Sequence, residues 1–384
     1  MRELVFVRSG RLAWAERPPP SVVDDTDALV RPFIAGRCDG DTLCIHRPVT
    51  RAMQAGLRLG LIDPVVASIV GHAPFHGPFA IGHECVAQVT AIGSQVQSLS
   101  VGDIVVVPWA VSCGTCERCA AGLTAKCSTM AAQSPGRTLA AFGFGDATGR
   151  WGGMISDSLR IPYADHMLVP VPQGVDPLRV AAASDNLSDA WRSVVVPLQD
   201  RPGGSVLVVG GGAHSIGLYA AGLAVAHGAA SVDYFDTDQS RLAIAESLGA
   251  NPRPVRSLRH LARLDELADR YDVAVEASSR SVGLQIALRA LRPGGCCQAT
   301  GYYLGPGTKV PVMNMYATSS TLQAGVSHVR PVLPDLLAFI SKTGFPAERV
   351  TTLLADWNDA PDAYAEKATK VVLHRPPLPV GEVR

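Results

Sequence analysis

Four cysteines in one short run constrain this chain more than any other feature of its sequence. They stand in Cys113-Gly-Thr-Cys116-Glu-Arg-Cys119, followed by Cys127, which gives a C-x2-C-x2-C-x7-C spacing. Four thiolates on a compact loop can close a tetrahedral shell around Zn²⁺ and leave no open position, as in structural zinc sites. The spacing therefore predicts a lobe, over about residues 109–130, that folds around a metal.

Disulfide pairing is the alternative for these cysteines. Disulfides need an oxidising compartment, but the N-terminal residues 1–4 lack the long apolar core of a signal peptide. The total of nine cysteines is also odd. We therefore expect metal-binding thiolates and a cytoplasmic protein.

The composition is that of a globular protein with room for two domains. The chain has 384 residues, 47% of them hydrophobic and 18% charged, and its formal net charge is zero. Its apolar stretches are shorter than the ~18 residues that a membrane helix needs. A neutral chain gives no electrostatic reason to expect nucleic acid or an anionic membrane as a partner.

Short strands and turns dominate the first part of the chain. Strand-like segments at 4–7, 27–32, 84–89 and 103–108 are each bounded by Gly, Pro or Asp. Between residues 52 and 70 the spacing of apolar side chains indicates helix instead, with Gly and Pro breaks.

From about residue 185, buried strands alternate with helices. The continuous apolar run 205–209 is typical of a parallel strand buried on both faces. A glycine cluster, a helix at 216–226 and a strand at 230–235 complete a βαβ unit. Further strands are predicted at 273–276 and 295–300, so we expect an α/β fold with a doubly wound parallel sheet. A helix at 333–342 and a last strand at 370–373 are expected to return to the first domain.

The glycine cluster is a candidate dinucleotide site. It lets backbone amides at a helix N-terminus approach a pyrophosphate. A G-x-G-x-x-G pattern ending at Gly217 would need glycine where the chain has His214. Either the loop is one residue longer than the pattern, or His214 adds a side chain near the phosphates. The expected cofactor contacts are Gly210, Gly212, His214, Ser215, Ile216 and Gly217.

Asp236 follows the glycine cluster by about 20 residues, at the end of the next predicted strand. A carboxylate there can bind the adenosine ribose hydroxyls and repels a 2′-phosphate. Neither Thr237 nor Asp238 is basic. The sequence thus favours NAD(H) over NADP(H), with Arg241 as a further predicted cofactor contact. The alternative for Asp236 is a solvated turn residue.

Two more candidate metal ligands lie outside the cysteine run. His83, in a Gly-His-Glu sequence before a predicted strand, offers an imidazole, with Glu84 beside it. Cys38 lies upstream in Gly-Arg-Cys-Asp-Gly-Asp. Taken singly, Cys38 is equally well explained as a small buried apolar residue, and His83 as a hydrogen-bonded histidine.

In combination these features resemble the zinc-dependent medium-chain alcohol dehydrogenase family. Its members carry a G-x-C-x-x-D segment, a G-H-E segment, a four-cysteine lobe and a Gly-rich nucleotide domain in this order, and the resemblance runs over nearly the whole chain. It implies a GroES-like, mainly β catalytic domain over residues 1–185 with a return at 323–384. It implies a Rossmann domain over 186–322, and a homodimer or homotetramer.

The resemblance also assigns roles to residues. Cys38 and His83 are implied as ligands of a catalytic zinc, with Asp185 as the third ligand and Asp189 as the competing candidate. Three protein ligands leave a fourth position for water or a substrate oxygen. The implied cofactors are two Zn²⁺ per chain and NAD(H). The implied catalytic residues are Cys38, His83, Asp185, Asp41 and Glu84, and the implied structural ligands are Cys113, Cys116, Cys119 and Cys127.

The implied reaction is hydride transfer between NAD(H) and a primary or secondary alcohol, or its aldehyde or ketone, with zinc as Lewis acid. A substrate from a specialised biosynthetic pathway fits the departures given below. The alternatives are a zinc-independent quinone or enoyl-type reductase, a non-catalytic NAD-binding relative, and an aldehyde dismutase with tightly held NAD.

Two positions depart from the family. Gly40 stands where Ser or Thr commonly relays a proton, so the relay could pass through Thr42, Asp39, His46 or water. Asp189 stands where the family often has a small hydroxyl residue near the nicotinamide.

The segment 47–78 is longer than the common family loop. It either covers the catalytic cleft or is a surface insertion. Trp151, Tyr163, Trp191 and Arg192 are candidates for the substrate pocket, with the core or the solvated surface as the alternative.

Overall fold

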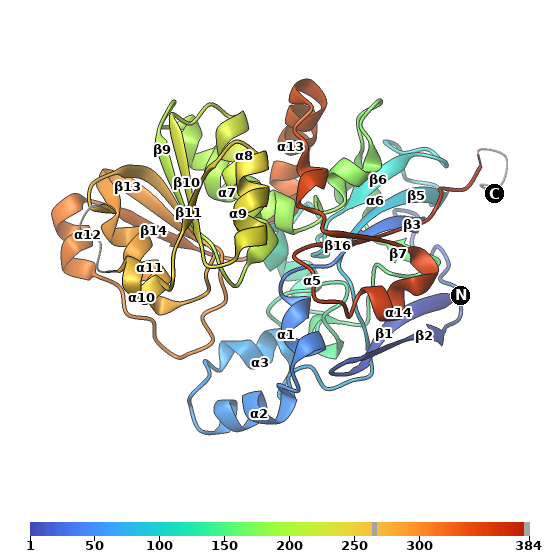
Figure 1. Cartoon of the computed structure of the whole chain (residues 1–384). Helices are drawn as coiled ribbons and strands as arrows, with labels where there is room; N and C mark the ends of the chain where they lie inside the picture. Colours follow the sequence, from blue (N-terminus) through green and yellow to red (C-terminus); the bar gives the residue numbers. More distant parts are fainter. Residues whose placement is uncertain (263–266, 380–384) are drawn as a thin grey trace. The chain divides into compact units, whose positions relative to one another are not determined.

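The computed structural model describes residues 1–262 and 267–379. The chain divides into two compact units, drawn in Figure 1. The first unit comprises Met1–Asp185, His328–Ser341 and Thr351–Arg384, of which residues 380–384 lie outside the described part. The second unit comprises Asn186–Ser327 and Lys342–Val350.

This division differs in the tail from the one expected from the sequence. Residues 323–327 and 342–350 belong to the second unit rather than to the return segment. Packing explains the latter, because Phe345 is buried against Gly222, where an added Cβ would lie 3.1 Å from the ring. Ala347 and Val350 are buried as well.

Six parallel strands form the sheet of the second unit, in the order β11-β10-β9-β12-β13-β14. This is the order of a doubly wound sheet, so the predicted fold class is confirmed. All five residues of the central strand β9 are buried, as expected for a strand covered on both faces. The strands are β9 (Ser205–Val209), β10 (Ser231–Asp236), β11 (Asn251–Pro254), β12 (Tyr271–Glu276), β13 (Leu291–Ala299) and β14 (Thr321–Ala324).

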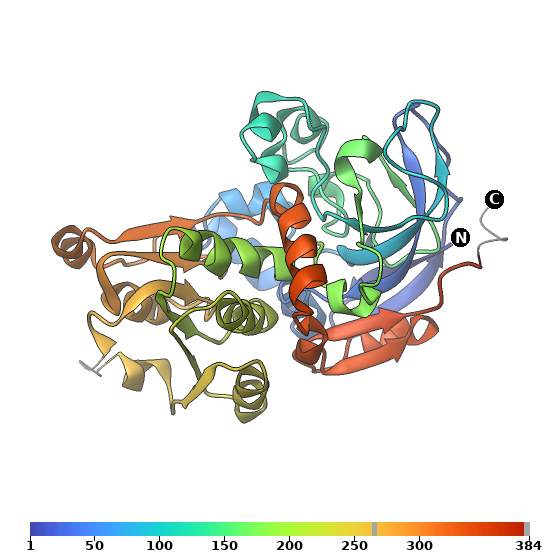
Figure 2. The same cartoon turned by 90° about the horizontal axis from the view of Figure 1, so that it is seen from above.

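Helices cover both faces of this sheet (Figures 1 and 2). The side chains of α10 and α11 join Leu207 and Val209 in one apolar cluster. The opposite face carries α7, α8 and α9, and Gly217 of α8 lies so close to β9 that a Cβ there would be 3.6 Å from Val208. The helices are α7 (Asn186–Gln199), α8 (His214–Ala226), α9 (Gln239–Ser247), α10 (Leu258–Leu261), α11 (Ser281–Arg289) and α12 (Val312–Thr318).

The first unit is mainly β. Its larger sheet has the order β15-β16-β3-β5-β6-β8, with β7 paired to β3, and its smaller sheet has the order β2-β1-β4. The predicted strands correspond to β1, β3, β5, β6 and β16, whereas β2, β4, β7, β8 and β15 were not predicted. The strands are β1 (Arg2–Arg8), β2 (Arg11–Glu16), β3 (Ala28–Gly36), β4 (Phe79–Ala80), β5 (Glu84–Ile92), β6 (Ile104–Val107), β7 (Leu159–Ile161), β8 (Val169–Pro170), β15 (Leu353–Asp356) and β16 (Val371–His374).

The antiparallel pair β3 and β5 places the candidate ligands at one end of the larger sheet. Gly36, the last residue of β3, is opposite Glu84, the first residue of β5. Cys38 follows β3 by two residues and His83 immediately precedes β5. The register therefore brings a thiol and an imidazole together although 44 residues separate them.

Short helices fill the connections of this unit. The insertion 47–78 forms α2 and α3, drawn in blue in Figure 1, and α3 packs against the 3₁₀ turn Asp146–Thr148. Leu59 and Leu61 of the insertion are 73% and 67% exposed. The helices are α1 (Asp41–His46), α2 (Thr50–Arg58), α3 (Val65–Val70), α4 (Glu117–Ala120), α5 (Ser128–Ala131), α6 (Ala164–Met167), α13 (Val329–Thr343) and α14 (Ala360–Ala363).

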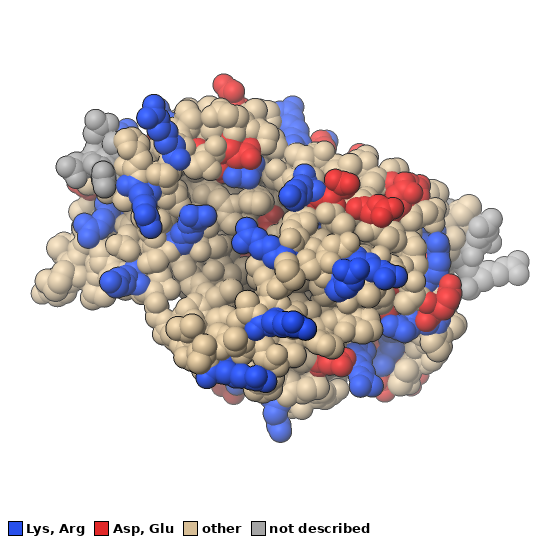
Figure 3. Space-filling model, turned by 60° about the horizontal axis from the view of Figure 1, so that its bottom comes forward, with Lys and Arg blue, Asp and Glu red and all other residues tan. Residues whose placement is uncertain are grey.

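Two surface properties bear on function. Within residues 1–262 and 267–379, no helix is both long and apolar enough to cross a membrane. On the face shown in Figure 3, the Lys and Arg side chains are spread among other side chains rather than gathered on one element.

Candidate metal centres and dinucleotide site

The four cysteines of the lobe converge as their spacing predicts. Their sulfur atoms all lie within 4.8 Å of one another, and none of the nine cysteines forms a disulfide. The Sγ atoms of Cys113 and Cys127 are 3.6 Å apart, and those of Cys116 and Cys127 are 3.8 Å apart. These separations are far longer than a disulfide bond and match the edge of about 3.8 Å of a tetrahedron with Zn–S bonds of about 2.3 Å. The set fits a zinc ion with four thiolate ligands.

Hydrogen bonds within the lobe lower the pKa of two of its thiols, Cys113 and Cys116. Burial raises the pKa of Cys116, but hydrogen bonds from Ser128 and from backbone amides outweigh it and bring the pKa to about 5. The amide of Cys116 donates to Cys113 Sγ at 3.4 Å. Burial also raises the pKa of Cys113, but its hydrogen bonds with Thr129, Thr115 and the backbone outweigh this and bring the pKa to about 7. Thiolates are the form that binds zinc.

A second group of ligand atoms lies within 4.8 Å of one another in the first unit, on Cys38, His83 and Asp185. Asp185 Oδ2 accepts a hydrogen bond from Cys38 Sγ at 3.1 Å and lies 3.4 Å from His83 Nε2. On the other side of the ring, Asp41 Oδ1 is 3.6 Å from His83 Nδ1. The competing candidate Asp189 is absent from this group and pairs with Arg192 in α7, with Nε to Oδ1 at 2.6 Å.

The histidine of this group indicates that a metal belongs there. His83 is 1% exposed, and neither of its ring nitrogens makes a hydrogen bond within the described residues. A buried imidazole whose nitrogens make no well-formed hydrogen bond is costly. A zinc ion on Nε2, with Asp41 accepting a hydrogen bond from the Nδ1–H group, would satisfy both nitrogens. Cys38, His83 and Asp185 fit an open zinc site with three protein ligands.

Without metal, protons occupy this centre. Burial raises the pKa of the Cys38 thiol, and the charge of Asp185 raises it further. Burial lowers the pKa of His83, but the carboxylates of Asp41 and Asp185 outweigh it and the pKa is raised. Burial raises the pKa of Asp185, and the neighbouring His83 more than offsets this. Binding of a cation would therefore release protons.

Glu84, which the resemblance implied as a catalytic residue, is not among the three converging candidate ligands. Its Oε2 accepts a charged hydrogen bond from Lys370 Nζ, and both side chains are fully buried. Lys370 also donates to the carbonyl of Arg37 at 2.9 Å. Space is tight, because an added Cβ at Gly36 would come within 2.4 Å of Glu84 Oε2. Glu84 therefore forms a buried ion pair directly after the candidate ligand His83 in the chain.

Two aromatic rings that the sequence did not single out stand beside His83. The Phe144 ring centroid is 4.4 Å from that of His83, and the Trp109 centroid is 6.5 Å away. The two rings are themselves 5.5 Å apart. Phe144 lies between Gly143 and Gly145, both with positive φ (75° and 82°), so the backbone turns sharply on each side of the ring. The Gly-Phe-Gly triplet is the sequence signal that could have pointed to Phe144.

Two of the side chains considered for the proton relay, Thr42 and His46, are hydrogen-bonded to backbone carbonyls. Thr42 Oγ1 donates to the carbonyl of Asp39 at 2.6 Å, and His46 Nε2 lies 3.0 Å from the carbonyl of Ala365. The amide of Gly40 donates to Cys38 Sγ at 3.3 Å. Gly40 therefore contributes a backbone donor to the thiol where a side-chain hydroxyl was expected.

In the second unit, the glycine cluster forms the turn from β9 into α8. Gly211 has φ +149°, and an added Cβ there would lie 2.8 Å from Ser278 Cα. The helix begins at His214, so Gly210 and Gly212 lie in the turn, and Ser215, Ile216 and Gly217 lie in the first turn of α8. Ser215 Oγ donates to Asn186 Oδ1 at 2.9 Å, which ties the start of α8 to the start of α7. The turn lies between β10 and β12, where the strand order reverses and doubly wound sheets bind nucleotides.

Asp236 ends β10 and is buried with all its oxygen atoms engaged. Arg241 donates to both carboxylate oxygens, Nε to Oδ2 and Nη2 to Oδ1, each at 2.7 Å. Tyr234 donates to Oδ2 at 2.9 Å. Burial raises the pKa of Asp236, but Arg241 holds it below its usual value. Asp236 is thus not the solvated turn residue of the alternative reading.

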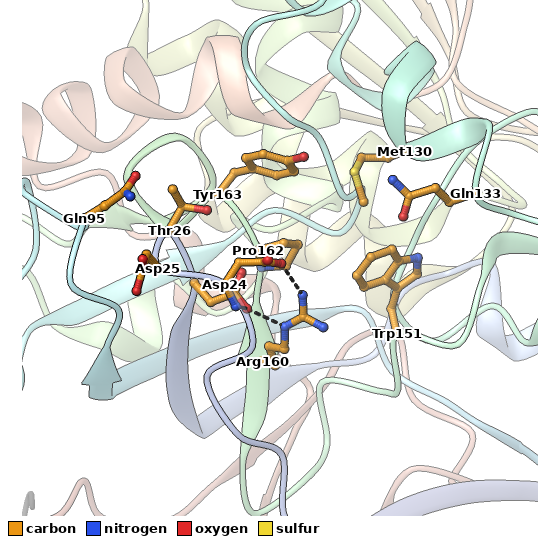
Figure 4. Close-up of a pocket in the computed structure, with 11 residues that line it drawn as sticks. Asp24, Asp25, Thr26, Gln95, Met130, Gln133, Trp151, Arg160, Pro162 and Tyr163 are labelled. Carbon is orange, nitrogen blue, oxygen red and sulfur yellow. Dashed lines mark hydrogen bonds and ion pairs between the residues drawn. The ribbon is translucent and has the colours of Figure 1, made fainter.

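Trp151 and Tyr163 line a cavity that contains none of the candidate metal ligands (Figure 4). Its volume is about 450 Å³, and its other lining residues include Met130, Gln133 and Arg160. Arg160 pairs there with Asp27 at 2.6 Å and with Asp24 at 3.4 Å. Trp191 is a buried residue of α7. The cavity lined by Trp151 and Tyr163 is therefore distinct from the ligand group of Cys38, His83 and Asp185.

Comparison with known proteins gives the family. Residues 24–173 match the model of the alcohol dehydrogenase GroES-like domain, and residues 215–342 match the model of the zinc-binding dehydrogenase domain. Together the two models match more than half of the chain. The chain belongs to the zinc-dependent medium-chain alcohol dehydrogenase family.

Individual relatives agree with this assignment. A probable zinc-binding alcohol dehydrogenase of Mycobacterium tuberculosis is 28% identical over 365 residues, which cover 95% of this chain and 85% of that protein. D-xylulose reductase A of Aspergillus niger is 27% identical over 77% of this chain and 74% of its own length. The solved alcohol dehydrogenase from Thermus sp. ATN1 is 29% identical with a TM-score of 0.79, covering 97% of this chain and 99% of that one.

Proposed function

We propose that this oxidoreductase transfers a hydride between NAD(H) and a primary or secondary alcohol, or the corresponding aldehyde or ketone, at a zinc ion held by Cys38, His83 and Asp185. The observation that carries the proposal is the convergence of these three ligand atoms within 4.8 Å, around a buried imidazole that lacks hydrogen-bond partners. A second, structural zinc is proposed for the four-cysteine lobe.

A zinc ion here would serve as Lewis acid for the substrate oxygen, and the dinucleotide would carry the hydride. The chain's own groups supply orientation and exclusion of water. Asp41 faces His83 Nδ1 and leaves Nε2 for the metal. Trp109 and Phe144 give the centre an apolar wall beside His83, which helps to exclude water.

The ion pair at the end of β10 supports NAD(H) as the cofactor. Arg241 is 12% exposed and is held on both carboxylate oxygens of Asp236, so its charge is already offset. A 2′-phosphate would meet the Asp236 carboxylate and could recruit Arg241 only by breaking this pair. We expect KM for NAD⁺ to be at least about tenfold lower than for NADP⁺, because loss of one charged hydrogen-bond pair costs about 1.5–3 kcal/mol.

The substrate is proposed as an alcohol or polyol. The relatives from Mycobacterium tuberculosis and Aspergillus niger bear the names of an alcohol dehydrogenase and a D-xylulose reductase. The departures at Gly40 and Asp189 favour a substrate of a specialised biosynthetic pathway. A panel of aliphatic, aromatic and polyhydroxylated alcohols, with NAD⁺ and NADP⁺ in parallel, addresses both points.

The decisive experiment is the zinc content per chain of the wild type, of Cys38→Ser and of Cys44→Ser. Cys44 is a matched control, because it is a buried thiol outside both groups that donates to the carbonyl of Asp41, a bond that serine can also make. We expect two zinc ions in the wild type and in Cys44→Ser. Cys38→Ser should keep one zinc and lose turnover on every alcohol tested.

One zinc in all three proteins would overturn the proposal. The fold would then be compatible with a zinc-independent quinone or enoyl-type reductase, or with a non-catalytic NAD-binding relative. NADPH-dependent reduction of a quinone would identify the former. NADH retention without turnover would identify the latter.

We also propose a homo-oligomer formed through the edge of the six-stranded sheet. β14 is the last strand of that sheet, and most of its residues are exposed. Beside it in the chain, α12 exposes Met313 and Tyr316 to 75% and 80%. Unpaired edges and exposed apolar groups are typical of interfaces. Analytical ultracentrifugation of wild type and Met313→Glu should show an assembly in the first and a smaller species in the second.

A further inference from the structure

Tyr364, from the end of the chain, holds the aspartate that faces His83. We propose that it is a positioning residue for the metal centre, acting through Asp41. Its hydroxyl donates to Asp41 Oδ2 at 2.7 Å, and its side chain is fully buried. The inference rests on the proposed function, because it presupposes a metal bound by Cys38, His83 and Asp185.

The two oxygens of Asp41 face different groups. Oδ2 accepts from Tyr364, whereas Oδ1 lies 3.6 Å from His83 Nδ1. A carboxylate held by one oxygen can rotate only within the limits of that bond. The Tyr364 hydroxyl therefore selects which oxygen faces the imidazole. This orients the ring and directs Nε2 toward Asp185 and Cys38.

A buried arginine clamps the segment that carries Tyr364. Arg37 is 1% exposed, and its guanidinium donates to the carbonyls of Tyr364 at 2.7 Å, Glu366 at 2.6 Å and Ala368 at 2.8 Å. Arg37 immediately precedes Cys38. Tyr364 is thus fixed at its carbonyl by Arg37 and at its hydroxyl by Asp41. These two residues flank the candidate ligand Cys38 in the sequence.

The hydroxyl of Tyr364 lies near the backbone that carries His83. An added Cβ at Gly82, which immediately precedes His83, would lie 3.6 Å from Tyr364 Oη and 2.7 Å from Ile155. Gly82 has φ +96°, which L side chains rarely adopt. A side chain at 82 would collide with Ile155 and would only touch the tyrosine hydroxyl, so Gly82 allows close packing directly before the candidate ligand His83.

The test compares metal affinity in Tyr364→Phe, Asp41→Asn and the double variant. Tyr364→Phe removes one oxygen atom and preserves the ring, so the packing of the aromatic side chain is kept. Partners of a metal-ligating histidine typically change metal affinity by about 10–100-fold. We expect Tyr364→Phe to weaken zinc at the Cys38 centre by about tenfold, measured by competition with a chromophoric chelator. Zinc in the four-cysteine lobe of the same molecule serves as the internal reference.

The double variant separates positioning from general stability. If Tyr364 acts through Asp41, Tyr364→Phe should weaken zinc in the wild-type background and add less than about twofold in the Asp41→Asn background. Cobalt substituted at the centre should show a shifted visible spectrum in Tyr364→Phe. Tyr271→Phe is the matched control, because Tyr271 is a buried tyrosine whose hydroxyl donates to Asp233 Oδ2 at 2.6 Å in the second unit, and it should change neither quantity.

Each outcome has a clear meaning. Equal zinc affinity in wild type and Tyr364→Phe would overturn the inference while leaving the proposed function intact. Equal, additive losses in both backgrounds would also overturn it, because they indicate a role that does not pass through Asp41. A wild type that binds zinc only at the four cysteines would instead overturn the proposed function.

Discussion

The two proposed metal centres of this chain are built in opposite ways. The lobe takes its four ligands from residues 113–127, and Cys116 is partly exposed. The second centre joins residues as far apart as Cys38 and Asp185, 147 positions along the chain, and its histidine is almost fully buried. A closed set of thiolates serves folding, whereas an open set of three mixed ligands serves chemistry. The comparison suggests that loss of the first should cost structure and loss of the second should cost turnover.

The largest expected effect is on the lobe. Cys127→Ser removes a ligand that contacts both Cys113 and Cys116. Zinc contributes about 10–16 kcal/mol to the folding of small metal-dependent modules, so we expect loss of one zinc and local unfolding. Limited proteolysis should then cut within residues 109–130. A variant that keeps two zinc ions and resists proteolysis would contradict the structural role.

The next effect concerns the open centre. Asp185→Asn leaves a neutral oxygen in place of the carboxylate that contacts both Cys38 and His83. We expect loss of the second zinc and a fall in kcat/KM of about a thousandfold or more, or about 4 kcal/mol, with the thermal midpoint nearly unchanged. The measurements are zinc content, steady-state kinetics and thermal unfolding. Retention of the second zinc in this variant would show that another residue completes the site.

A third effect distinguishes the thiols of the metal-free protein. The pKa of Cys116 is lowered to about 5 and that of Cys38 is raised, so at pH 7 the first is thiolate and the second is thiol. With a thiolate as the nucleophile, iodoacetamide should label Cys116 at least about tenfold faster than Cys38. Where the metal-free lobe keeps its fold, the rate at Cys116 should change little between pH 9 and pH 6, because this range lies above its pKa of about 5. A lobe that unfolds without zinc should instead show a rate that falls steeply over this range. Mass spectrometry of the labelled peptides gives both rates, and faster labelling of Cys38 would reverse the assignment.

The smallest effect is expected at Asp189, which tests the choice of third ligand. Asp189→Asn breaks the 2.6 Å pair with Arg192, whose side chains are 8% and 13% exposed. We expect a loss of about 2 kcal/mol in the free energy of unfolding and an unchanged content of two zinc ions. Chemical denaturation and elemental analysis provide the two numbers. A loss of zinc here, with Asp185→Asn unaffected, would exchange the roles of the two aspartates.

Features that depend on residues close together in the sequence could be predicted, whereas features that depend on contacts between distant residues could not. The cysteine spacing predicted a compact lobe because its ligands are neighbours in sequence. The strand at 205–209 and the helix after it were predicted because burial on both faces leaves a continuous apolar run. Short strands such as β15, with alternately half-buried and exposed residues, carry no such signal.

The surroundings of the second centre were beyond sequence reasoning for the same reason. Cys38, His83 and Asp185 could be grouped only through the family resemblance, because nothing local links them. Trp109, Phe144 and Lys370 reach the centre through tertiary packing, and nothing in their own neighbourhoods predicts it. Asp236 and Arg241 were both predicted as cofactor contacts, but their ion pair could be recognised only from the side-chain geometry.

The Arg37 clamp has a consequence for the order in which the protein is made. A ribosome releases the four lobe cysteines when less than half of the chain has been synthesised, so that lobe can take up its ion early. The hydrogen bonds of Arg37 can form only after the carbonyls of Tyr364, Glu366 and Ala368 have been synthesised, more than 320 residues later. With the proposed ligands, the nascent chain could therefore hold zinc at the four cysteines long before the clamp beside Cys38 is complete, so the two centres would mature at different stages of synthesis.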